Sequence, residues 1–191
     1  MKNLNWMPHI GMNFNLYVDG LGLLFSLLIT GIGSLVVLYS IGYLSKSEQL
    51  GNFYCYLLLF MGAMLGVVLS DNFIILYLFW ELTSFSSFLL ISFWREKKAS
   101  IYGAQKSLII TVLGGLSMLG GIILLSLATD TFSIQAMISK ASDIQNSPFF
   151  ILAMILFMIG AFTKSAQVPF YIWLPDAMEA VSYTHLRAHE T

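Results

Sequence analysis

Five stretches of this chain run for 18 to 26 residues with almost no charged side chain, and no other feature restricts its fold so strongly. A helix needs about 20 apolar residues to cross the hydrocarbon core of a bilayer. Lipid offers no partners to stray backbone groups, and the stretches are too long for the strands of a barrel. The pattern therefore predicts an all-α membrane protein with five transmembrane helices, over residues 21–44, 53–70, 72–94, 107–128 and 149–174.

The overall composition supports a membrane environment. Hydrophobic residues make up 58% of the chain, charged residues only 10%, and the mean hydropathy is +0.80, whereas a soluble domain carries about 25% charged residues. The formal net charge of −1 gives nucleic acid no reason to bind. We expect three parts, an extramembrane segment over 1–20, a transmembrane helical fragment over 21–180, and an atypical tail over 181–191.

The usual sequence signals of enzyme chemistry are missing. The chain contains no glycine-rich phosphate loop, no HExxH motif and no CxxC motif. Cys55 is its one cysteine, which excludes disulfides and cysteine-ligated clusters within the chain. We therefore expect no catalytic residue, no metal and no cofactor, and a role other than that of an enzyme.

The basic residues predict how the chain lies in the membrane. Loops between successive spans alternate sides, and cytoplasmic loops carry an excess of lysine and arginine. We therefore expect a plasma membrane protein with the 95–106 loop in the cytoplasm and the N-terminus outside. One side holds Lys46, Arg95, Lys97, Lys98 and Lys106, and the other holds Lys2 and Lys140.

Two ionisable residues interrupt the apolar stretches. Glu81 is the tenth residue of the third stretch, close to the midplane, where a lone carboxylate costs about 2.5–3.5 kcal/mol or more. Lys164 is the sixteenth residue of the fifth stretch and has ten residues still to come. We interpret both as proton-translocation sites. The alternatives are a structural carboxylate that ties two helices for Glu81, and a side chain that snorkels to the interface for Lys164.

Pro169 follows Lys164 by five residues and lacks a backbone N–H, so the last helix is expected to kink or break. The break should leave the carbonyl of Ser165 without its helical partner, close to the ammonium, as in the broken helices of transporters. Ser165 and Gln167 are therefore secondary candidates. Further secondary candidates are Asp19, which also suits a helix cap, and Asp176 and Glu179, which could line an entrance.

Glu81 and Lys164 together suggest a proton relay. A lysine that alternately meets and loses a carboxylate partner alternately holds and releases a proton. The sequence leaves open whether these two residues meet each other or face different partners.

Small residues predict close packing between helices, and they recur at Gly62, Gly66, Gly114, Gly115, Ser117, Gly120 and Gly121.

Four segments carry a family resemblance: YVDGLGLLF, the run from GNFYCYLLLF to FLLISFW, YGAQKSLIITVLGGLSMLGG, and GAFTKSAQVPFYIWLPDAMEA. They resemble the antiporter-like membrane subunits, which comprise the large membrane subunits of complex I and the A and D subunits of Mrp-type multisubunit Na+/H+ antiporters. The likeness covers roughly residues 13–180. WELTSFSSFLL and WLPDAMEA look most like the A-type member of the Mrp complex. The complex I subunit typically reads WEGVG and WLADAM, and has an acid where this chain has Gly115.

The resemblance implies that Glu81 is the family's fifth-helix glutamate and Lys164 its seventh-helix lysine. It implies a proton-translocating subunit fragment of a multisubunit monovalent cation (Na+)/proton antiporter, whose partners are other subunits, the lipid bilayer, protons and monovalent cations. A non-redox, proton-pumping subunit of complex I is the alternative, and a module that only packs against partner subunits is a third reading. The family pattern has two helices before the Asp-Gly-Leu segment and continues differently after DAMEA. We therefore expect a chain truncated at both ends, with junction sequence over 181–191.

Overall fold

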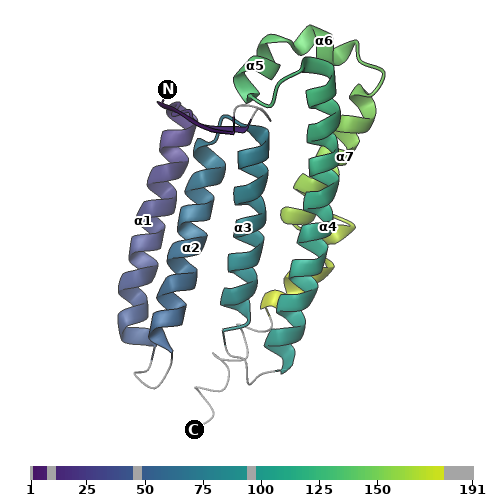
Figure 1. The fold of residues 1–191 in the computed structure, drawn as a ribbon. Helices are drawn as coiled ribbons and strands as arrows, with labels where there is room; N and C mark the ends of the chain where they lie inside the picture. Colours follow the sequence, from purple (N-terminus) through teal and green to yellow (C-terminus); the bar gives the residue numbers. More distant parts are fainter. Residues whose placement is uncertain (1, 8–11, 45–48, 94–97, 179–191) are drawn as a thin grey trace.

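The computed structural model of the chain describes residues 2–7, 12–44, 49–93 and 98–178 (Figure 1). Four helices in this part are long and apolar enough to cross a membrane, and a fifth apolar helix is shorter. The expected all-α membrane architecture is confirmed, and the count of five apolar helices agrees with it. The four long helices are α1 (Gly20–Tyr43), α2 (Leu50–Leu69), α3 (Phe73–Ile91) and α4 (Lys98–Thr129), and the shorter one is α7 (Phe150–Lys164).

The helices form a row with a second layer at one end. Figure 1 shows α1, α2 and α3 side by side, then α4, with α7 lying along α4. The most extensive helix contact is between α4 and α7, and α3 packs against both α2 and α4. Helix α4 therefore stands between the two helices that carry Glu81 and Lys164, which are α3 and α7.

Short polar side chains start two of the long helices. Asp19 is the N-cap of α1 and accepts a hydrogen bond from the backbone N–H of Gly22 at 2.6 Å. Asn72 is the N-cap of α3 and accepts from the N–H of Ile74 at 3.0 Å. Such caps satisfy backbone donors that the first helical turn leaves free. The expected cap at Asp19 is thus confirmed.

An antiparallel hairpin precedes α1, and the sequence reasoning missed it. It consists of β1 (Lys2–Met7) and β2 (Met12–Leu16). Its second strand is fixed to the turn between α2 and α3, because Asp71 donates its N–H to the carbonyl of Asn15 at 3.0 Å and Tyr17 donates to that of Leu69 at 2.9 Å. The signal was present, since apolar and polar residues alternate in KNLNWM and MNFNL.

The same turn also holds the connection after α4. Asp71 is only 3% exposed, and its carboxylate accepts from the hydroxyl of Ser133 at 2.9 Å and from the N–H of Gln135 at 3.2 Å. These bonds anchor the short helix α5 (Ile134–Ser139), which is followed by α6 (Ala141–Gln145). Asp71 is therefore a structural junction between the hairpin, the turn from α2 to α3, and α5.

Helix α4 begins earlier than its apolar stretch. It starts at Lys98, so residues 98–106, which we assigned to a loop, are helical, and Lys106 lies on the helix. A helix of 32 residues spans about 48 Å at 1.5 Å per residue, whereas the hydrocarbon core is about 30 Å thick. Hydropathy detects only the part of such a helix that suits lipid, and this explains the error.

The expected break of the last helix is confirmed, but it comes before Pro169. Helix α7 ends at Lys164, and Ala166 adopts a left-handed φ of 52°. The N–H of Gln167 reaches the carbonyl of Phe162 at 2.9 Å, and that of Ala166 reaches Thr163 at 3.4 Å. These two bonds form a Schellman motif, which ends a helix by itself.

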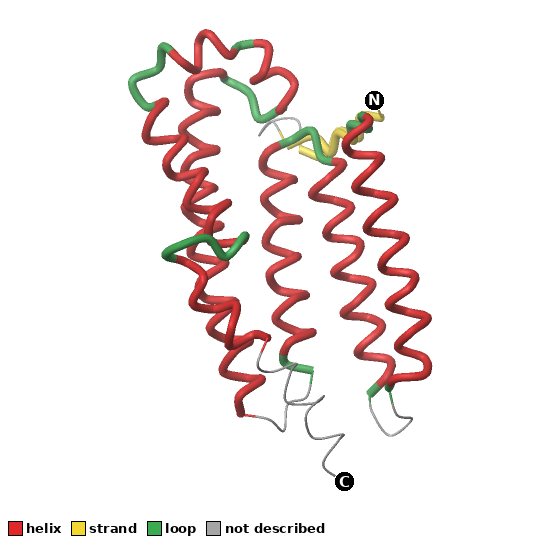
Figure 2. Tube along the Cα trace, turned by 180° about the vertical axis from the view of Figure 1, so that it is seen from behind, coloured by secondary structure: helices red, strands yellow, loops and turns green. Residues whose placement is uncertain are grey.

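After the break the chain continues in a loop at mid-height of the bundle (Figure 2) and then in the 3-10 helix η2 (Phe170–Trp173). The indole N–H of Trp173 donates to the carbonyl of Thr163 at 3.0 Å. The freed carbonyl that finds a side-chain donor is therefore that of Thr163, whereas the sequence pointed to that of Ser165. Residues 181–191 and Glu179 lie outside the described residues, so the junction origin of the tail stays a prediction.

The fourth stretch packs through its glycines, as expected. A Cβ at Gly114 would overlap the side chain of Thr163, and one at Gly121 would lie 2.7 Å from the carbonyl oxygen of Ala153. Small residues let helix backbones approach closely in a membrane. In the second stretch Gly66 receives the ring of Phe79, but Gly62 has no atom of the described chain within 4 Å of its Cβ position.

We expect Gly121→Ala to destabilise the full-length protein by about 1–3 kcal/mol, because the new methyl meets the backbone of α7, which cannot turn aside. Gly120→Ala is the matched control, since its Cβ would lie 3.6 Å from Leu156, an ordinary contact. The midpoint of thermal unfolding in detergent measures both. Equal midpoints for the two variants would contradict the described contact between α4 and α7.

Candidate functional site

Lys164 reaches across to α3. It is the last residue of α7, and its ammonium donates to the hydroxyl of Ser84 at 2.6 Å and to that of Thr83 at 2.8 Å. The carbonyl of Trp80 lies at 3.5 Å, and the ammonium sits 5.5 Å from the centre of the Trp80 ring. Hydroxyl oxygens and an aromatic face both stabilise a cation. The side chain therefore points at the hydroxyl residues of α3.

The polar face of α3 explains why the ammonium settles there. Thr83, Ser84 and Ser86 are between 0% and 4% exposed. The Thr83 hydroxyl donates to the carbonyl of Trp80 at 2.7 Å, and that of Ser86 donates to Leu82 at 2.8 Å. Hydroxyls that donate to their own helix keep lone pairs free for another donor. This face is a preformed set of acceptors for a cation.

Glu81 points from the middle of α3 toward α4. Its Oε1 atom packs against Gly115, where a Cβ would overlap it. That oxygen is buried and has no hydrogen-bond partner among the described residues. A buried carboxylate oxygen without a partner is costly when it is ionised. Glu81 thus lies where α3 meets α4, and its role as a proton site stays a prediction.

Glu81 and Lys164 are neighbours without being an ion pair. Within the described residues the carboxylate and the ammonium do not come within salt-bridge distance of each other. The ammonium instead binds Ser84, three residues after Glu81 on the same helix. Residues three apart lie on one helix face, about one turn from each other. The ammonium and the carboxylate therefore do not pair directly, and the ammonium binds the hydroxyls of Thr83 and Ser84 instead.

The secondary candidates do not gather at this site. Ser165 and Gln167 are exposed on the loop after α7. Asp176 forms an ion pair with Lys106 on α4 at 2.5 Å. Asp19 caps α1 beside the hairpin, and Glu179 lies outside the described residues.

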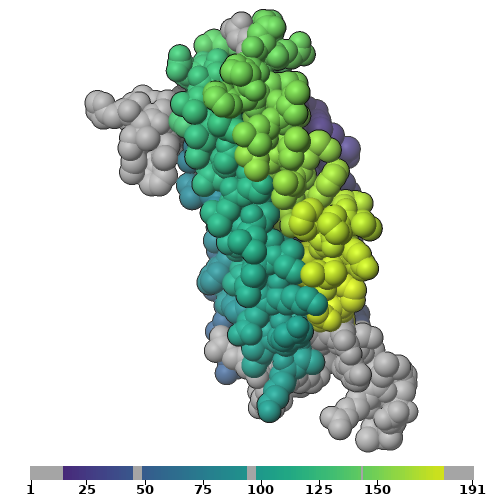
Figure 3. Space-filling view, turned by 90° about the vertical axis from the view of Figure 1, so that its right-hand side faces the viewer, coloured from purple at the N-terminus to yellow at the C-terminus, as the bar shows by residue number. Residues whose placement is uncertain are grey.

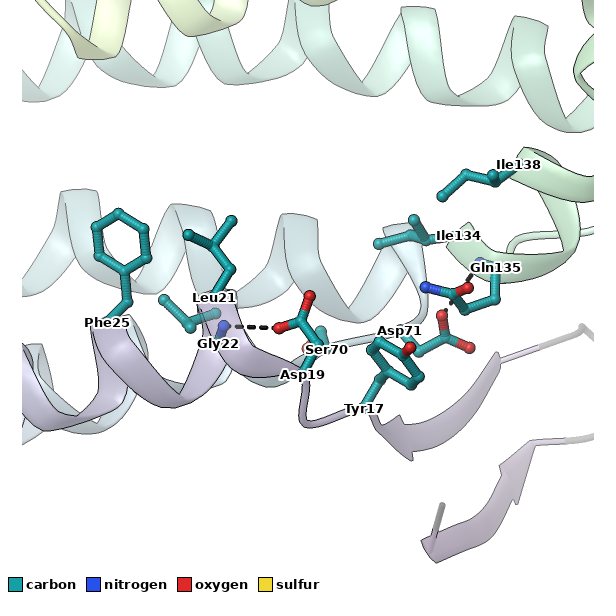
Figure 4. A pocket seen from close by; sticks show the side chains of 11 residues that line it. Tyr17, Asp19, Leu21, Gly22, Phe25, Ser70, Asp71, Ile134, Gln135 and Ile138 are labelled. Carbon is teal, nitrogen blue, oxygen red and sulfur yellow. Dashed lines mark hydrogen bonds between the residues drawn. The ribbon is translucent and has the colours of Figure 1, made fainter.

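A cavity of about 370 Å³ lies near Asp19, at the end of the bundle that carries the hairpin (Figure 4). Both Asp19 and Asp71 line it, together with Gln135 from α5. Neither Glu81 nor Lys164 reaches it, so it is separate from the site on α3. Across the described ranges no group of three histidine, cysteine, aspartate or glutamate side chains could hold a metal ion. The other lining residues are Tyr17, Leu21, Gly22, Phe25, Val68, Ser70, Ile134 and Ile138.

Sequence reasoning identified the charged residues of the site but missed their partners. The run of hydroxyl residues from Thr83 to Ser87 gives the stretch around Glu81 a polar face. It gave no sign that this face would receive Lys164 from another helix. Gly115 was noted as a packing residue and as a position where the complex I subunit has an acid, but not as the residue that makes room for the carboxylate.

Two family models match the chain. Residues 70–184 match the model described as NADH:quinone oxidoreductase/Mrp antiporter, TM. Residues 6–54 match the model described as NADH-Ubiquinone oxidoreductase (complex I), chain 5 N-terminus. The first match contains Glu81, Ser84, Gly115 and Lys164.

Curated relatives are similar over most of the chain. The A1 subunit of the Na(+)/H(+) antiporter of Staphylococcus epidermidis (strain ATCC 35984) is 99% identical over 180 residues, which is 94% of this chain and 22% of the relative. The A1 subunit from Staphylococcus aureus (strain JH9) is 88% identical over the same shares. The chain thus spans about a fifth of the length of the curated relatives it matches.

Two solved structures share the fold. A chain of the Mrp complex from Dietzia sp. DQ12-45-1b superposes with a TM-score of 0.85 at 36% identity, over 93% of this chain and 19% of that one. A chain of the membrane-bound sulfane sulfur reductase, an archaeal respiratory membrane complex, gives 0.80 at 24% identity, over 92% and 35%. The second likeness concerns the fold alone.

Proposed function

This chain belongs to the NADH:quinone oxidoreductase/Mrp antiporter family, and from that premise we propose that it is part of a proton-translocating subunit of a multisubunit monovalent cation (Na+)/proton antiporter. The observation that carries the proposal is the position of Lys164. Its ammonium rests on Ser84, one helical turn from a buried carboxylate oxygen of Glu81 that has no partner in the described chain. The near identity to relatives named as A1 subunits of Na(+)/H(+) antiporters supports the choice of the antiporter.

The relay works by an exchange of partners. While the Lys164 side chain rests on Thr83 and Ser84, the carboxylate of Glu81 has no cation beside it and takes up a proton. When the lysine side chain moves one turn along α3 to Glu81, it takes that proton, and the ammonium and the ionised carboxylate stabilise each other. When it returns to Thr83 and Ser84, it has lost its carboxylate partner and releases the proton. Ser84 and Glu81 lie about one turn apart on one face of α3, so a movement of the Lys164 side chain alone is enough for this step.

The surroundings follow from the same proposal. The parent subunit lies in the plasma membrane, next to other subunits of the antiporter, and passes protons and monovalent cations. The hairpin and α5 lie at one end of the bundle and the start of α4 at the other (Figure 1). The loops at the end of the bundle where α4 begins contain more basic residues than those at the other end. We therefore place that end in the cytoplasm and the N-terminus outside.

A proton-pumping subunit of complex I is the second candidate. The match of residues 6–54 to a complex I chain favours it. Gly115 argues against it, because an acid at this position would occupy the space that the Glu81 carboxylate fills.

The two candidates differ in what drives proton movement. We expect that inverted membrane vesicles containing the complete complex with the full-length subunit, acidified by respiration, lose their pH gradient when Na+ is added. A pH-sensitive dye measures this, and vesicles without the complex are the control. The alternative outcome has two parts: Na+ leaves the pH gradient unchanged, and the complex itself builds up a gradient from NADH and quinone. That outcome would favour the complex I subunit over the antiporter.

A further inference from the structure

The segment that follows the broken helix returns to α4. Asp176 lies two residues past Leu174, and its Oδ2 accepts from the ammonium of Lys106 at 2.5 Å. The two side chains are 29% and 28% exposed. Figure 3 shows the yellow end of the described chain lying against the lower part of α4. This ion pair joins residues that are 70 positions apart in sequence.

Backbone contact accompanies the ion pair. A Cβ at Gly103, one turn before Lys106 on α4, would lie 2.5 Å from the carbonyl oxygen of Asp176 and 3.4 Å from the nitrogen of Ala177. Ala177 is only 6% exposed. The chain after η2 therefore lies directly on the backbone of α4, and the ion pair fixes its position along that helix. We call the contact of Gly103 and Lys106 with Asp176 the α4 clamp.

The clamped segment is also tied to the end of α7. Trp173, three residues before Asp176, donates its indole N–H to the carbonyl of Thr163 at 3.0 Å. Thr163 is 3% exposed, packs against Gly114 and directly precedes Lys164. The loop between Lys164 and η2 adds little packing to this connection, because its side chains are mostly exposed. The exposed residues are Ser165, Gln167, Val168 and Pro169. The segment after the break is thus connected to the end of α7 by the bond between Trp173 and Thr163, and the α4 clamp fixes the segment itself.

We propose that Lys106 and Asp176 are positioning residues that hold the segment after the break on α4 and so keep Lys164 directed at Ser84. Asp176, a secondary proton-site candidate on sequence grounds, then acts through Trp173 and touches no transported proton. The inference rests on the proposed relay, because it assigns what holds that relay in place. If Asp176 carried protons itself, its carboxylate could not be moved to position 106 without loss of transport. If it only clamps the segment, exchanging the two charges between positions 106 and 176 keeps the ion pair and the function.

The test uses the complete complex with Lys106→Gln, Asp176→Asn, and the exchanged pair Lys106→Asp with Asp176→Lys. A partly exposed ion pair has a modest worth, so we expect each single variant to lower Na+-dependent proton exchange roughly two- to fivefold. The exchanged pair should restore it. Lys98→Gln is the matched control, since Lys98 is exposed near the start of the same helix.

A second readout is independent of transport. Spin labels on cysteines replacing Ile109 of α4 and Tyr171 of η2, which are 59% and 50% exposed, report the distance between helix and segment in a background with Cys55→Ser and the complex's other cysteines replaced. We expect a narrow distribution in the parent, a broad one in both single variants, and a narrow one again in the exchanged pair.

An unchanged distribution in the single variants would overturn the clamp, and so would an exchanged pair that stays broad. Exchange that stays at the parental rate while the distribution broadens would overturn its link to Lys164, provided that Lys164→Ala abolishes exchange. If Lys164→Ala has no effect, the proposed relay fails by itself. The spin-label distances then still decide whether the clamp exists.

Discussion

Lys164→Ala in the full-length subunit should reduce Na+-dependent proton exchange to the level of membranes without the complex, while the complex still assembles. The alanine removes the group that moves between Ser84 and Glu81. Assembly survives because α7 keeps its contacts with α4 through Thr163 and Gly114. Proton flux in vesicles measures the first effect, and recovery of the intact complex in detergent measures the second.

Lys164→Arg separates a relay from a structural tie. A guanidinium keeps the positive charge and can bind Thr83 and Ser84, but it does not release its proton in proteins. We expect this variant to assemble and to remain inactive in exchange. Ser165→Ala, on the adjacent exposed residue, should exchange at the parental rate. Exchange by the arginine variant at a rate close to the parent would reduce Lys164 to a structural cation.

Glu81→Ala should also abolish exchange without preventing assembly, because the relay then lacks its carboxylate. Glu81→Gln sharpens the result, since it keeps the size of the side chain but cannot ionise. We expect both variants to be inactive in the same vesicle assay. A glutamine variant that still exchanges protons would show that Glu81 ties helices together and carries nothing.

Gly115→Ala offers a second way to disturb the same carboxylate. The methyl group would take the place of Oε1, and a flexible side chain gives way more easily than a backbone does. The carboxylate should therefore move, with little loss of thermal stability and a clear loss of exchange. Gly120→Ala, where the new methyl makes an ordinary contact, should lose neither.

Local patterns were enough to predict most of the fold. Each of the four long helices covers most of one of the apolar stretches, because lipid requires such stretches whatever the tertiary contacts are. The start of α4 was misplaced by nine residues, at position 107 instead of Lys98. The hairpin was missed, although apolar and polar residues alternate in its strands, because a search for long apolar stretches does not detect this pattern. The end of α7 was harder to place, because a Schellman motif usually contains glycine at the left-handed position, and this chain has Ala166 there.

The candidate site divides in the same way. Glu81 and Lys164 could be found from the sequence, since single charges in apolar stretches are conspicuous. Their partners could not, because Ser84 and Lys164 come from helices whose relative rotation only packing determines. Lys106 and Asp176 also form a long-range contact, and the sequence around either residue does not indicate that the other is its partner.

The adjacent glycines of α4 have a mechanical consequence. Gly114 receives Thr163 of α7 and Gly115 receives Glu81 of α3. Successive residues on a helix point about 100° apart, so one short length of α4 meets both neighbours on two different sides. A displacement of α4 at this level therefore changes its contacts with the lysine helix and with the glutamate helix together.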